Sequence, residues 1–516
     1  MNFLDLFRAT LPETVLEVAA LLVLAIDLLF LKRVALKIRV AVAALLGVAG
    51  CVVAGWALQV TAGEVFRWGN EILLASGGFI TVAQAGTLVL TALTLLLLLE
   101  ERFTPHIGEF VAVVLMAAAG GLLVCGAQDL LVIFIGLELL SLGLYILTAF
   151  HKTSGASAEA ALKYYLFGGM SAAFLLFGFS YLYGLSGSTN LLRIFATLAG
   201  NMDAAQSPFL LVAFVLIVTG LGFKVAAAPF HFWAPDAYEG APAPAAALIA
   251  SASKVASFAL ILNFTLAGHH LVLQHLRGAD YFGALGNVGI MAFWLSSAFA
   301  VLAAVSMVFG NLAALAQSSV RRLLAYSAIA HAGYLLLGVA YGLPRSGAAA
   351  AYAGISGNAN AVLYYILTYG LTTVGAFGVV AVVERATGSD RLDAFSGLYR
   401  RNKLLAGVLL VLFLSLAGIP PLVGFWAKFN LFAAVLSVGA GKAPFVLVVL
   451  ALAMSAVSLY YYLQVLKRAF VTPAIDETPI KAHWVTTVVL LAIALAVILA
   501  GCFPALLQGW IEAAYR

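Results

Sequence analysis

Two stretches of the sequence decide the fold: Lys-Val-Ala-Ala-Ala-Pro-Phe-His-Phe-Trp at 224–233 and Gly-Ile-Pro-Pro-Leu-Val-Gly-Phe-Trp-Ala-Lys at 418–428. Each places proline and one lysine inside a long apolar run. Proline lacks a backbone N–H and interrupts a helix, and irregular backbone at membrane depth is tolerated only where it lines protein or a water-filled cavity. Two interrupted helices at corresponding positions predict inverted repeats with an ion path between them. Two unrelated proline kinks are the alternative.

The composition of the chain supports a membrane protein. Hydrophobic residues make up 64% of its 516 residues and charged residues only 9%, whereas soluble domains carry roughly 25% charged residues. A soluble enzyme, a secreted disulfide scaffold and a disordered chain are therefore excluded. The apolar runs are also far longer than the ~10-residue alternating segments of an outer-membrane barrel. The predicted fold class is all-α, a polytopic membrane protein.

A membrane-spanning helix needs about 20 apolar residues. By this rule the sequence predicts about 14 transmembrane helices, at residues 11–31, 36–59, 73–99, 108–126, 130–150, 157–184, 208–234, 242–267, 284–314, 322–342, 356–384, 403–436, 444–468 and 484–507. The two candidate repeats then define four parts of the chain. These are helices 1–3 (1–107), a first five-helix repeat of helices 4–8 (108–267), a second of helices 9–13 (268–470) and helix 14 (471–516).

Basic residues predict the orientation. Loops after odd-numbered spans carry 16 Lys and Arg residues, and the opposite side, with both termini, carries 7. The positive-inside rule places the odd loops in the cytoplasm and both termini on the periplasmic side of a bacterial inner membrane. The net charge of +5 therefore reflects membrane loops, and no basic face is dense enough to predict nucleic-acid binding.

Four of the 27 basic residues, Lys163, Lys224, Lys254 and Lys428, fall inside predicted spans. A lysine at mid-membrane costs about 2.5–3.5 kcal/mol on insertion scales, so such residues mark an ion path by default. Snorkelling to the interface is the alternative. Lys163 lies four residues after Glu159, and an ordinary i,i+4 pair explains it about as well as function does.

Other polar residues in the spans extend the predicted path. Glu138 has Ser141 and Tyr145 on its helix face, and an ion pair with a buried lysine is favoured over a neutral carboxyl. In a Glu138–Lys224 pair, closing keeps the lysine charged and opening drives its proton toward Lys254. The corresponding position in the second repeat falls near His331, which favours a relay role over a structural histidine.

Further polar residues stand beside this path. Ser251 and Ser257 share a face with Lys254 and suggest a hydrated route. A stripe on helix 11 is expected to line a water wire: Tyr365, Thr368, Tyr369 and Thr372. The acids of helix 1, at positions 13, 17 and 27, either pair with neighbouring subunits or flank the interface.

Nothing in the sequence predicts a cofactor or a metal in this chain. Cys51, Cys125 and Cys502 stand singly in apolar runs without metal-ligand spacing. A phosphate-binding loop and a dinucleotide fingerprint are also absent from the sequence.

These residues also carry a family resemblance. Glu138 and Lys224, Pro-Phe-His-Phe-Trp-Ala-Pro-Asp at 229–236, Ser-Ala-Ser-Lys at 251–254 and the stretch 418–428 resemble the antiporter-like membrane subunits of respiratory complex I, over essentially the whole chain. The run Ala-Ala-Leu-Lys-Tyr-Tyr-Leu-Phe-Gly at 160–168 is similar to the subunit N type. Lys428 departs from subunit M, where the family has glutamate, and the chain lacks the lateral helix of subunit L.

The resemblance implies a proton-translocating subunit of NADH:quinone oxidoreductase. Electrons would pass from NADH to quinone through FMN and iron–sulfur clusters in other subunits, with K- and M-type subunits as neighbours. It implies proton-relay roles for Glu138, Lys224, Lys254 and Lys428, and extends them to Lys163 and His331. A subunit of a multi-subunit (Mrp-like) cation/proton antiporter is the alternative, and the buried lysines argue against a purely structural spacer.

Overall fold

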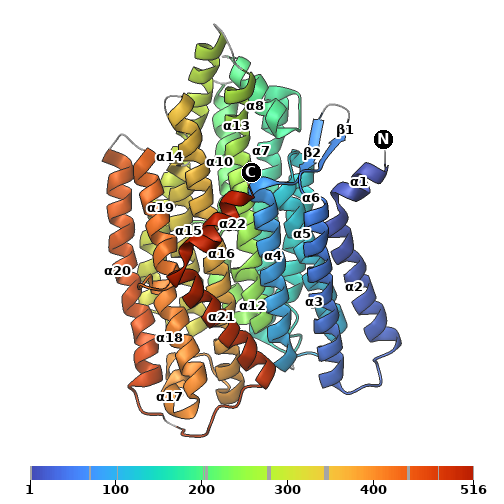
Figure 1. Cartoon of the computed structure of the whole chain (residues 1–516), viewed down its shortest axis with the longest axis vertical. Coiled ribbons are helices and arrows are strands. Elements are labelled where there is room, and N and C mark those ends of the chain that lie inside the picture. Colours follow the sequence, from blue (N-terminus) through green and yellow to red (C-terminus); the bar gives the residue numbers. More distant parts are fainter. Residues whose placement is uncertain are drawn as a thin grey trace.

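The computed structural model describes residues 3–68, 71–101, 103–201, 203, 207–275, 280–341, 348–438, 442–474 and 476–514. Four residues used to predict the orientation lie outside this part of the chain: Arg102, Arg277, Arg345 and Arg516. The described chain is a bundle of helices that run up and down along one long axis, as Figure 1 shows.

The first half of the chain contains one hairpin and the helices up to the first break. Their bounds are α1 (Phe3–Ala9), α2 (Leu11–Leu29), α3 (Leu36–Val60), β1 (Val65–Trp68), β2 (Glu71–Ala75), α4 (Gly78–Leu97), η1 (Leu98–Glu100), α5 (Ile107–Gly126), α6 (Leu130–Thr148), α7 (Gly155–Ser186), α8 (Leu191–Gly200) and α10 (Pro208–Lys224).

The remaining elements follow the break after α10. Their bounds are α11 (Trp233–Gly240), α12 (Ala243–Ala250), α13 (Ala252–His275), α14 (Asp280–Leu315), α15 (Val320–Tyr341), α16 (Ala348–Thr387), η2 (Leu392–Phe395), α17 (Leu398–Arg401), α18 (Lys403–Ala417), α19 (Val423–Val438), α20 (Lys442–Phe470), α21 (Trp484–Cys502) and α22 (Pro504–Ala513).

The structure confirms an all-α, multi-pass membrane fold. Within the described residues, eleven helices are long and apolar enough to cross a membrane. The other three predicted spans coincide with α2, which carries three acids, and with the broken pairs α10–α11 and α18–α19. We call the end of the bundle with the loops at 30–35, 149–154, 316–319 and 388–402 the basic end; it is the lower end in Figure 1.

One predicted helix boundary is wrong. The sequence predicts a helix from residue 73, but residues 71–75 pair with Val65–Trp68 as an antiparallel hairpin. The helix begins only at Gly78 because the residue before it, Gly77, adopts a positive φ of 109°, which a regular helix excludes.

Both proline breaks are present. In the first, residues 225–232 separate α10 from α11, and in the second, residues 418–422 separate α18 from α19. Gly418 ends α18 with φ of 88°, the left-handed conformation that glycine adopts most readily after a helix. Each of the two predicted repeats therefore holds one helix interrupted at proline, beside a buried lysine.

A third interruption was missed by the sequence analysis, which predicted one helix over 242–267. Ser251 separates α12 from α13, with φ of −122° and ψ of −85°. Its N–H donates to the Leu248 carbonyl, and its hydroxyl donates to the carbonyl of Ala247, a local competition with the helix that serine favours. The irregular residue lies three positions before Lys254.

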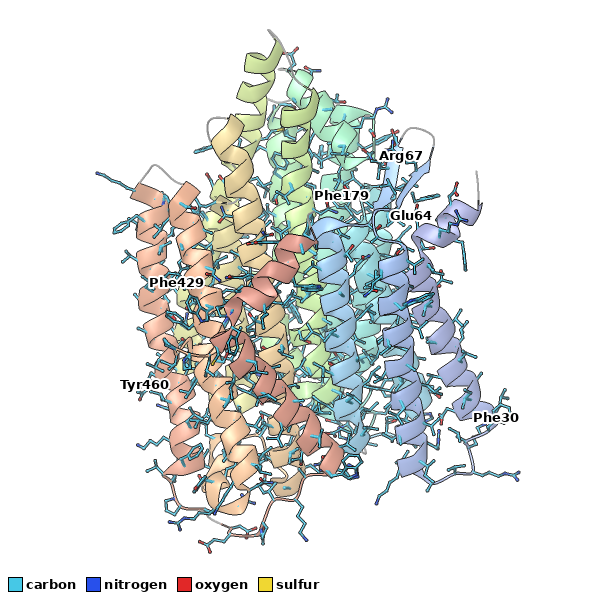
Figure 2. The ribbon with its side chains drawn as sticks, viewed as in Figure 1. Phe30, Glu64, Arg67, Phe179, Phe429 and Tyr460 are labelled. Carbon is cyan, nitrogen blue, oxygen red and sulfur yellow. The ribbon has the colours of Figure 1, made fainter. Side chains whose placement is uncertain are left out.

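The helices α19 and α20 carry large exposed side chains on their outer faces, whereas α12, α13 and α15 are enclosed. Phe429 of α19 and Tyr460 of α20 are more than half exposed, and Figure 2 labels both on the outer side of the bundle. In contrast, every residue in the apolar window of α12–α13 and nearly every one in α15 is buried. Lys254 and His331 are thus held inside protein.

Candidate functional site

The first buried lysine meets the buried acid through a serine. Lys224, the last residue of α10, has its Nζ 3.8 Å from Oε1 of Glu138 on α6. The same Nζ donates to Ser141 Oγ at 2.6 Å, and Ser141 in turn donates to the Leu137 carbonyl at 2.5 Å. The predicted Glu138–Lys224 pair is thus present as a loose ion pair, and Ser141 makes the shorter contact.

Backbone geometry fixes Lys224 at the break. After it, Ala226 adopts a φ of 58°, a left-handed conformation that residues other than glycine rarely adopt. The Ala228 N–H donates to Ser306 Oγ of α14 at 2.8 Å, and the Trp233 indole donates to the Phe223 carbonyl at 3.0 Å. The interruption is therefore satisfied by partners inside the protein, as membrane depth requires.

Lys254 reaches from the first predicted repeat into the second. Its Nζ donates to the carbonyl of Ala328 on α15 at 2.8 Å and lies 5.9 Å from the centre of the Tyr369 ring. The hydroxyls of Ser251 and Ser257, predicted to line a hydrated route, donate to carbonyls of their own helix, those of Ala247 and Ser253.

His331 lies between two tyrosines. Tyr365 Oη is 2.9 Å from its Nδ1, and Tyr462 Oη is 3.4 Å from its Nε2 and also bonds to Ser327 Oγ. A cavity of about 10 Å³ adjoins the ring, with room for about one water. Its lining includes the four residues of the predicted helix 11 stripe: Tyr365, Thr368, Tyr369 and Thr372.

Lys428 bridges the second break. Its Nζ donates to the carbonyl of Ala417, the last residue of α18, at 2.9 Å and to Ser455 Oγ of α20 at 2.9 Å. Helix C-termini carry free carbonyls and a partial negative charge, so this position favours a cation. The Tyr334 ring lies 5.6 Å from the same Nζ.

Tyrosine rings stand between these ionisable groups. The Tyr369 ring centre is 4.6 Å from that of His331 and 5.9 Å from Lys254 Nζ. On the other side of His331, the Tyr334 ring lies 5.7 Å away and also faces Lys428. Lys254, His331 and Lys428 therefore form one buried series with Tyr369 and Tyr334 between them.

Lys163 lies apart from that series, at the basic end. Its Nζ pairs with Glu159 at 2.7 Å, as the i,i+4 alternative predicts, and with Asp236 of α11 at 2.8 Å. Arg322 of α15 binds Asp236 and Glu239 at 2.7 and 2.8 Å. Asp236 thus links both predicted repeats through two cations.

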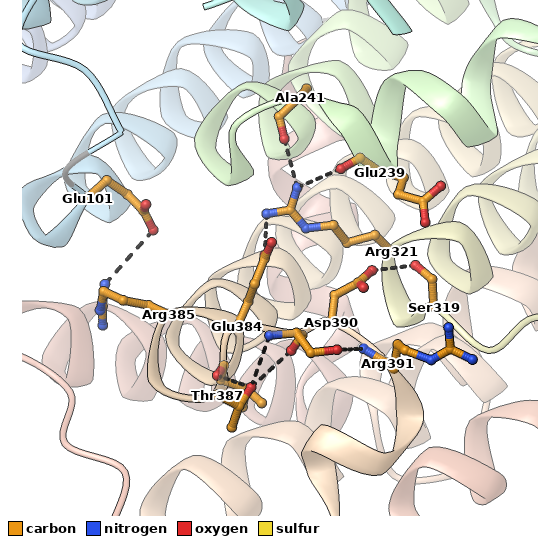
Figure 3. Close-up of polar contacts among 12 residues, drawn as sticks. Glu101, Glu239, Ala241, Ser319, Arg321, Glu384, Arg385, Thr387, Asp390 and Arg391 are labelled. Atoms are coloured by element: carbon orange, nitrogen blue, oxygen red, sulfur yellow. Dashed lines mark hydrogen bonds and ion pairs between the residues drawn. The ribbon is translucent and has the colours of Figure 1, made fainter. Parts of the chain in front are cut away.

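A second group of ion pairs, shown in Figure 3, continues along the basic end. Arg321 donates to the Glu239 and Ala241 carbonyls at 3.1 and 2.7 Å, and pairs with Glu384 at 2.5 Å. Arg385 approaches Glu101 at 3.9 Å and Glu100 at 2.5 Å. These contacts join α11, α15 and α16 to the loop before α5.

Sequence reasoning missed several residues of the site. Tyr462 and Ser455 come from α20, whose run Ser-Leu-Tyr-Tyr-Tyr at 458–462 was an available signal of buried polar groups. Asp27 of α2 forms a bidentate pair with Arg39 at 2.8 and 2.7 Å, a partner that the sequence analysis did not name. Among the described residues, no three His, Cys, Asp or Glu side chains are grouped as a metal site.

Comparison with known proteins identifies the family. Residues 127–276 and 282–458 match the family described as NADH:quinone oxidoreductase/Mrp antiporter, transmembrane. The chain is 48% identical to NADH-quinone oxidoreductase subunit N 2 of Acidobacterium capsulatum, over 99% of both chains. This chain belongs to the subunit N family of NADH-quinone oxidoreductases. As a subunit N family member, it is a multi-pass membrane protein of a respiratory complex whose cofactors are carried elsewhere.

Solved structures agree with the subunit N fold. A chain of respiratory complex I from Thermus thermophilus with bound aureothin is 33% identical, with a TM-score of 0.74, and the match covers 96% of this chain and 98% of that one. A chain of the Mrp complex from Dietzia sp. matches over the full length of both at 20% identity and a TM-score of 0.72. At this low identity, the match to the Mrp complex shows a shared fold but not a shared function.

Proposed function

We propose that this chain is the proton-translocating N-type subunit of an NADH:quinone oxidoreductase. The single observation that carries the proposal is the buried series Lys254–Tyr369–His331–Tyr334–Lys428, which runs from α13 to α19. Buried cations are expensive in a membrane interior, and a line of them marks an ion path. Membership of the subunit N family supports the same function.

In this proposal Glu138 and Lys224 control the start of the path. The 3.8 Å separation of their charged atoms leaves the pair loose enough to open, while Ser141 stays bonded to Lys224. When Glu138 is near, Lys224 keeps its proton. When the pair opens, the desolvated lysine loses its counter-charge and passes the proton on toward Lys254.

Protons cross the remaining gaps through water and hydroxyls. Among the described residues, no hydrogen bond joins one lysine to the next, so water molecules are required between them. The cavity beside His331 has room for one. Tyr365 and Tyr462 hold both ring nitrogens of His331, which fixes its orientation for exchange with that water. Lys163 would act at the basic end, upstream of the buried series.

The proposed neighbour on the α6 side is a K-type subunit, with an M-type subunit on another face. Glu138 is a quarter exposed and lies within an outward apolar stripe of Leu131, Ile135, Leu142 and Ile146. A carboxylate facing lipid at this depth is costly. A neighbouring subunit that covers the stripe and offers Glu138 a polar contact removes that cost.

The proposed location is the bacterial inner membrane, with the basic end in the cytoplasm and both termini in the periplasm. The enzyme's NADH, FMN, iron–sulfur and quinone sites lie in other subunits of the assembled complex, whose electron transfer drives the relay.

Reconstituted vesicles test the function. The assembled complex with Lys254→Met should lose most proton uptake and quinone-linked NADH oxidation, because the variant keeps the side chain's length but carries no proton. Lys152→Met, at an exposed loop, is the matched control and should behave as wild type. Sodium–proton exchange that is independent of NADH oxidation would instead assign the chain to the Mrp-type antiporters.

A further inference from the structure

A groove of about 740 Å³ lies on the outer surface between α18 and α20. Leu410 and Leu414 of α18 form one wall, and Tyr460 and Leu463 of α20 form the other. Figure 2 labels Tyr460 at the outer edge of α20, where its side chain is 58% exposed. The groove therefore opens away from the bundle and is separate from the buried series of lysines.

Two cations stand at one end of this groove. Lys467 and Arg468 line it where α20 reaches the basic end, together with Thr472. Lys467 is exposed, and no acid of the described chain forms an ion pair with it. Arg468 pairs with Asp393 at 3.2 Å, but both side chains are exposed, and such surface pairs contribute little. One guanidinium nitrogen of Arg468 contacts Asp393. The other N–H groups of this guanidinium can therefore donate to a second anion.

The dimensions match one leaflet of a bilayer. Tyr460 precedes Lys467 by seven residues, which is about 10 Å along a helix. Leu414 follows Lys403, at the basic end of α18, by eleven residues or about 16 Å. Half of the hydrocarbon core of a membrane is about 15 Å thick. The apolar walls thus have the length of one acyl layer, and the cations lie at headgroup level.

From this geometry we infer that the groove between α18 and α20 binds one phospholipid with a negatively charged headgroup. Its acyl chain lies along Leu410, Leu414 and Leu463, and its phosphate is held by Lys467 and Arg468. No acidic residue lines the groove, so nothing opposes an anion there. A neighbouring subunit's apolar helix fits less well, because it would cover the walls and leave Lys467 without a counter-charge.

Photo-crosslinking in nanodiscs tests this inference on the assembled complex. The probe is phosphatidylglycerol with a photoreactive acyl chain, and mass spectrometry locates the labelled peptides. We expect labelling at residues 460–472 and 410–414. Each cation contributes on the order of fivefold to binding of an anionic lipid near the surface. K467Q/R468Q should therefore reduce labelling about 25-fold, whereas the charge-preserving K467R/R468K should retain it.

Matched controls separate the possible outcomes. K32Q/R33Q removes two adjacent exposed cations at the same end of the bundle, outside the groove, and should leave the labelling unchanged. NADH oxidation should persist in all these variants, which verifies assembly. Equal labelling by the phosphatidylcholine analogue, or undiminished labelling of K467Q/R468Q, overturns the inference. Absence of lipid labelling at residues 460–472 and 410–414 in the unmodified complex also overturns the inference and favours a subunit interface at the groove.

Discussion

The indole Nε1–H of Trp426 donates a 2.8 Å hydrogen bond to the carbonyl oxygen of Gly501. Trp426 lies two residues before Lys428 on α19, and Gly501 lies at the end of α21, where helix carbonyls lack partners. A Cβ atom on Gly501 would approach the Pro421 carbonyl to 2.2 Å, so the end of α21 packs directly on the second break. The last long helix thus holds the segment that positions Lys428.

Trp426→Phe should reduce coupled proton uptake about fivefold while the complex still assembles. The substitution keeps an aromatic ring but removes one hydrogen bond, worth about 1 kcal/mol. The expected signature is a changed pH profile of NADH oxidation, because the environment of Lys428 shifts with the break. Trp510 is exposed on α22, so Trp510→Phe is the control and should change neither proton uptake nor the pH profile. An unchanged pH profile would show that the hydrogen bond from Trp426 to Gly501 has only a structural role.

Lys224 should tolerate neither alanine nor arginine. Alanine removes the proton carrier, and arginine keeps the charge but effectively never deprotonates in proteins. Both variants should lose most of the coupled NADH oxidation in vesicles, with assembly verified by subunit composition. Lys224→Arg at wild-type activity would show that this position needs only its charge.

Local signals in the sequence single out candidate residues, but they do not identify the partners of those residues in the fold. Proline inside an apolar run and a lysine at membrane depth are local signals, so both breaks and the buried Lys224, Lys254 and Lys428 could be named. The contact of Lys254 with the Ala328 carbonyl could not, because it joins α13 to α15 across 74 residues. The same holds for Tyr462, which reaches His331 from α20.

Local errors have equally physical causes. The second strand of the hairpin, Glu71–Ala75, ends in apolar residues that are continuous with the next apolar run, so the sequence predicts a helix from residue 73. Only Gly77 and Gly78 mark the point where the hairpin ends. The break at Ser251 carries no proline. A serine in a helix usually causes no interruption, so its competition with the backbone becomes evident only in three dimensions.

Glu101 should make the stability of the complex pH-dependent. Burial raises its pKa from 4.5 to about 7, against the opposing effect of Arg385 and Arg321. An acid whose folded pKa is raised favours the folded state below pH 4.5, and that stabilisation is lost as pH rises to about 7. The loss is at most on the order of 3 kcal/mol. In Glu101→Gln, the melting temperature should vary less between pH 5 and 8 than it does in the wild type. An unchanged pH dependence of the melting temperature would contradict the raised pKa of Glu101.

Cysteine labelling should place the loop at 388–402 in the cytoplasm. The excess of basic residues in odd-numbered loops is the reason, since such loops are retained on that side. A single cysteine at Ser389 should react with an impermeant maleimide only in inverted vesicles, and one at Glu64, beside the hairpin, only in intact spheroplasts. The reverse pattern would invert the proposed direction of proton movement.

Lys428→Met should reduce proton uptake and NADH oxidation in parallel. Lys428 is held by the Ala417 carbonyl and Ser455, and methionine keeps the chain's length while removing the group that carries the proton. Each proton moved against 100 mV stores about 2.3 kcal/mol, so a leak at this site would dissipate most of that energy. Tight coupling therefore predicts that both rates fall together. Ser455→Ala is the informative companion, because it removes one of the two contacts but leaves the proton carrier, and its loss should be smaller. If oxidation and pumping both stay at wild-type levels in Lys428→Met, the lysine only caps α18, and the exit must lie in a neighbouring subunit.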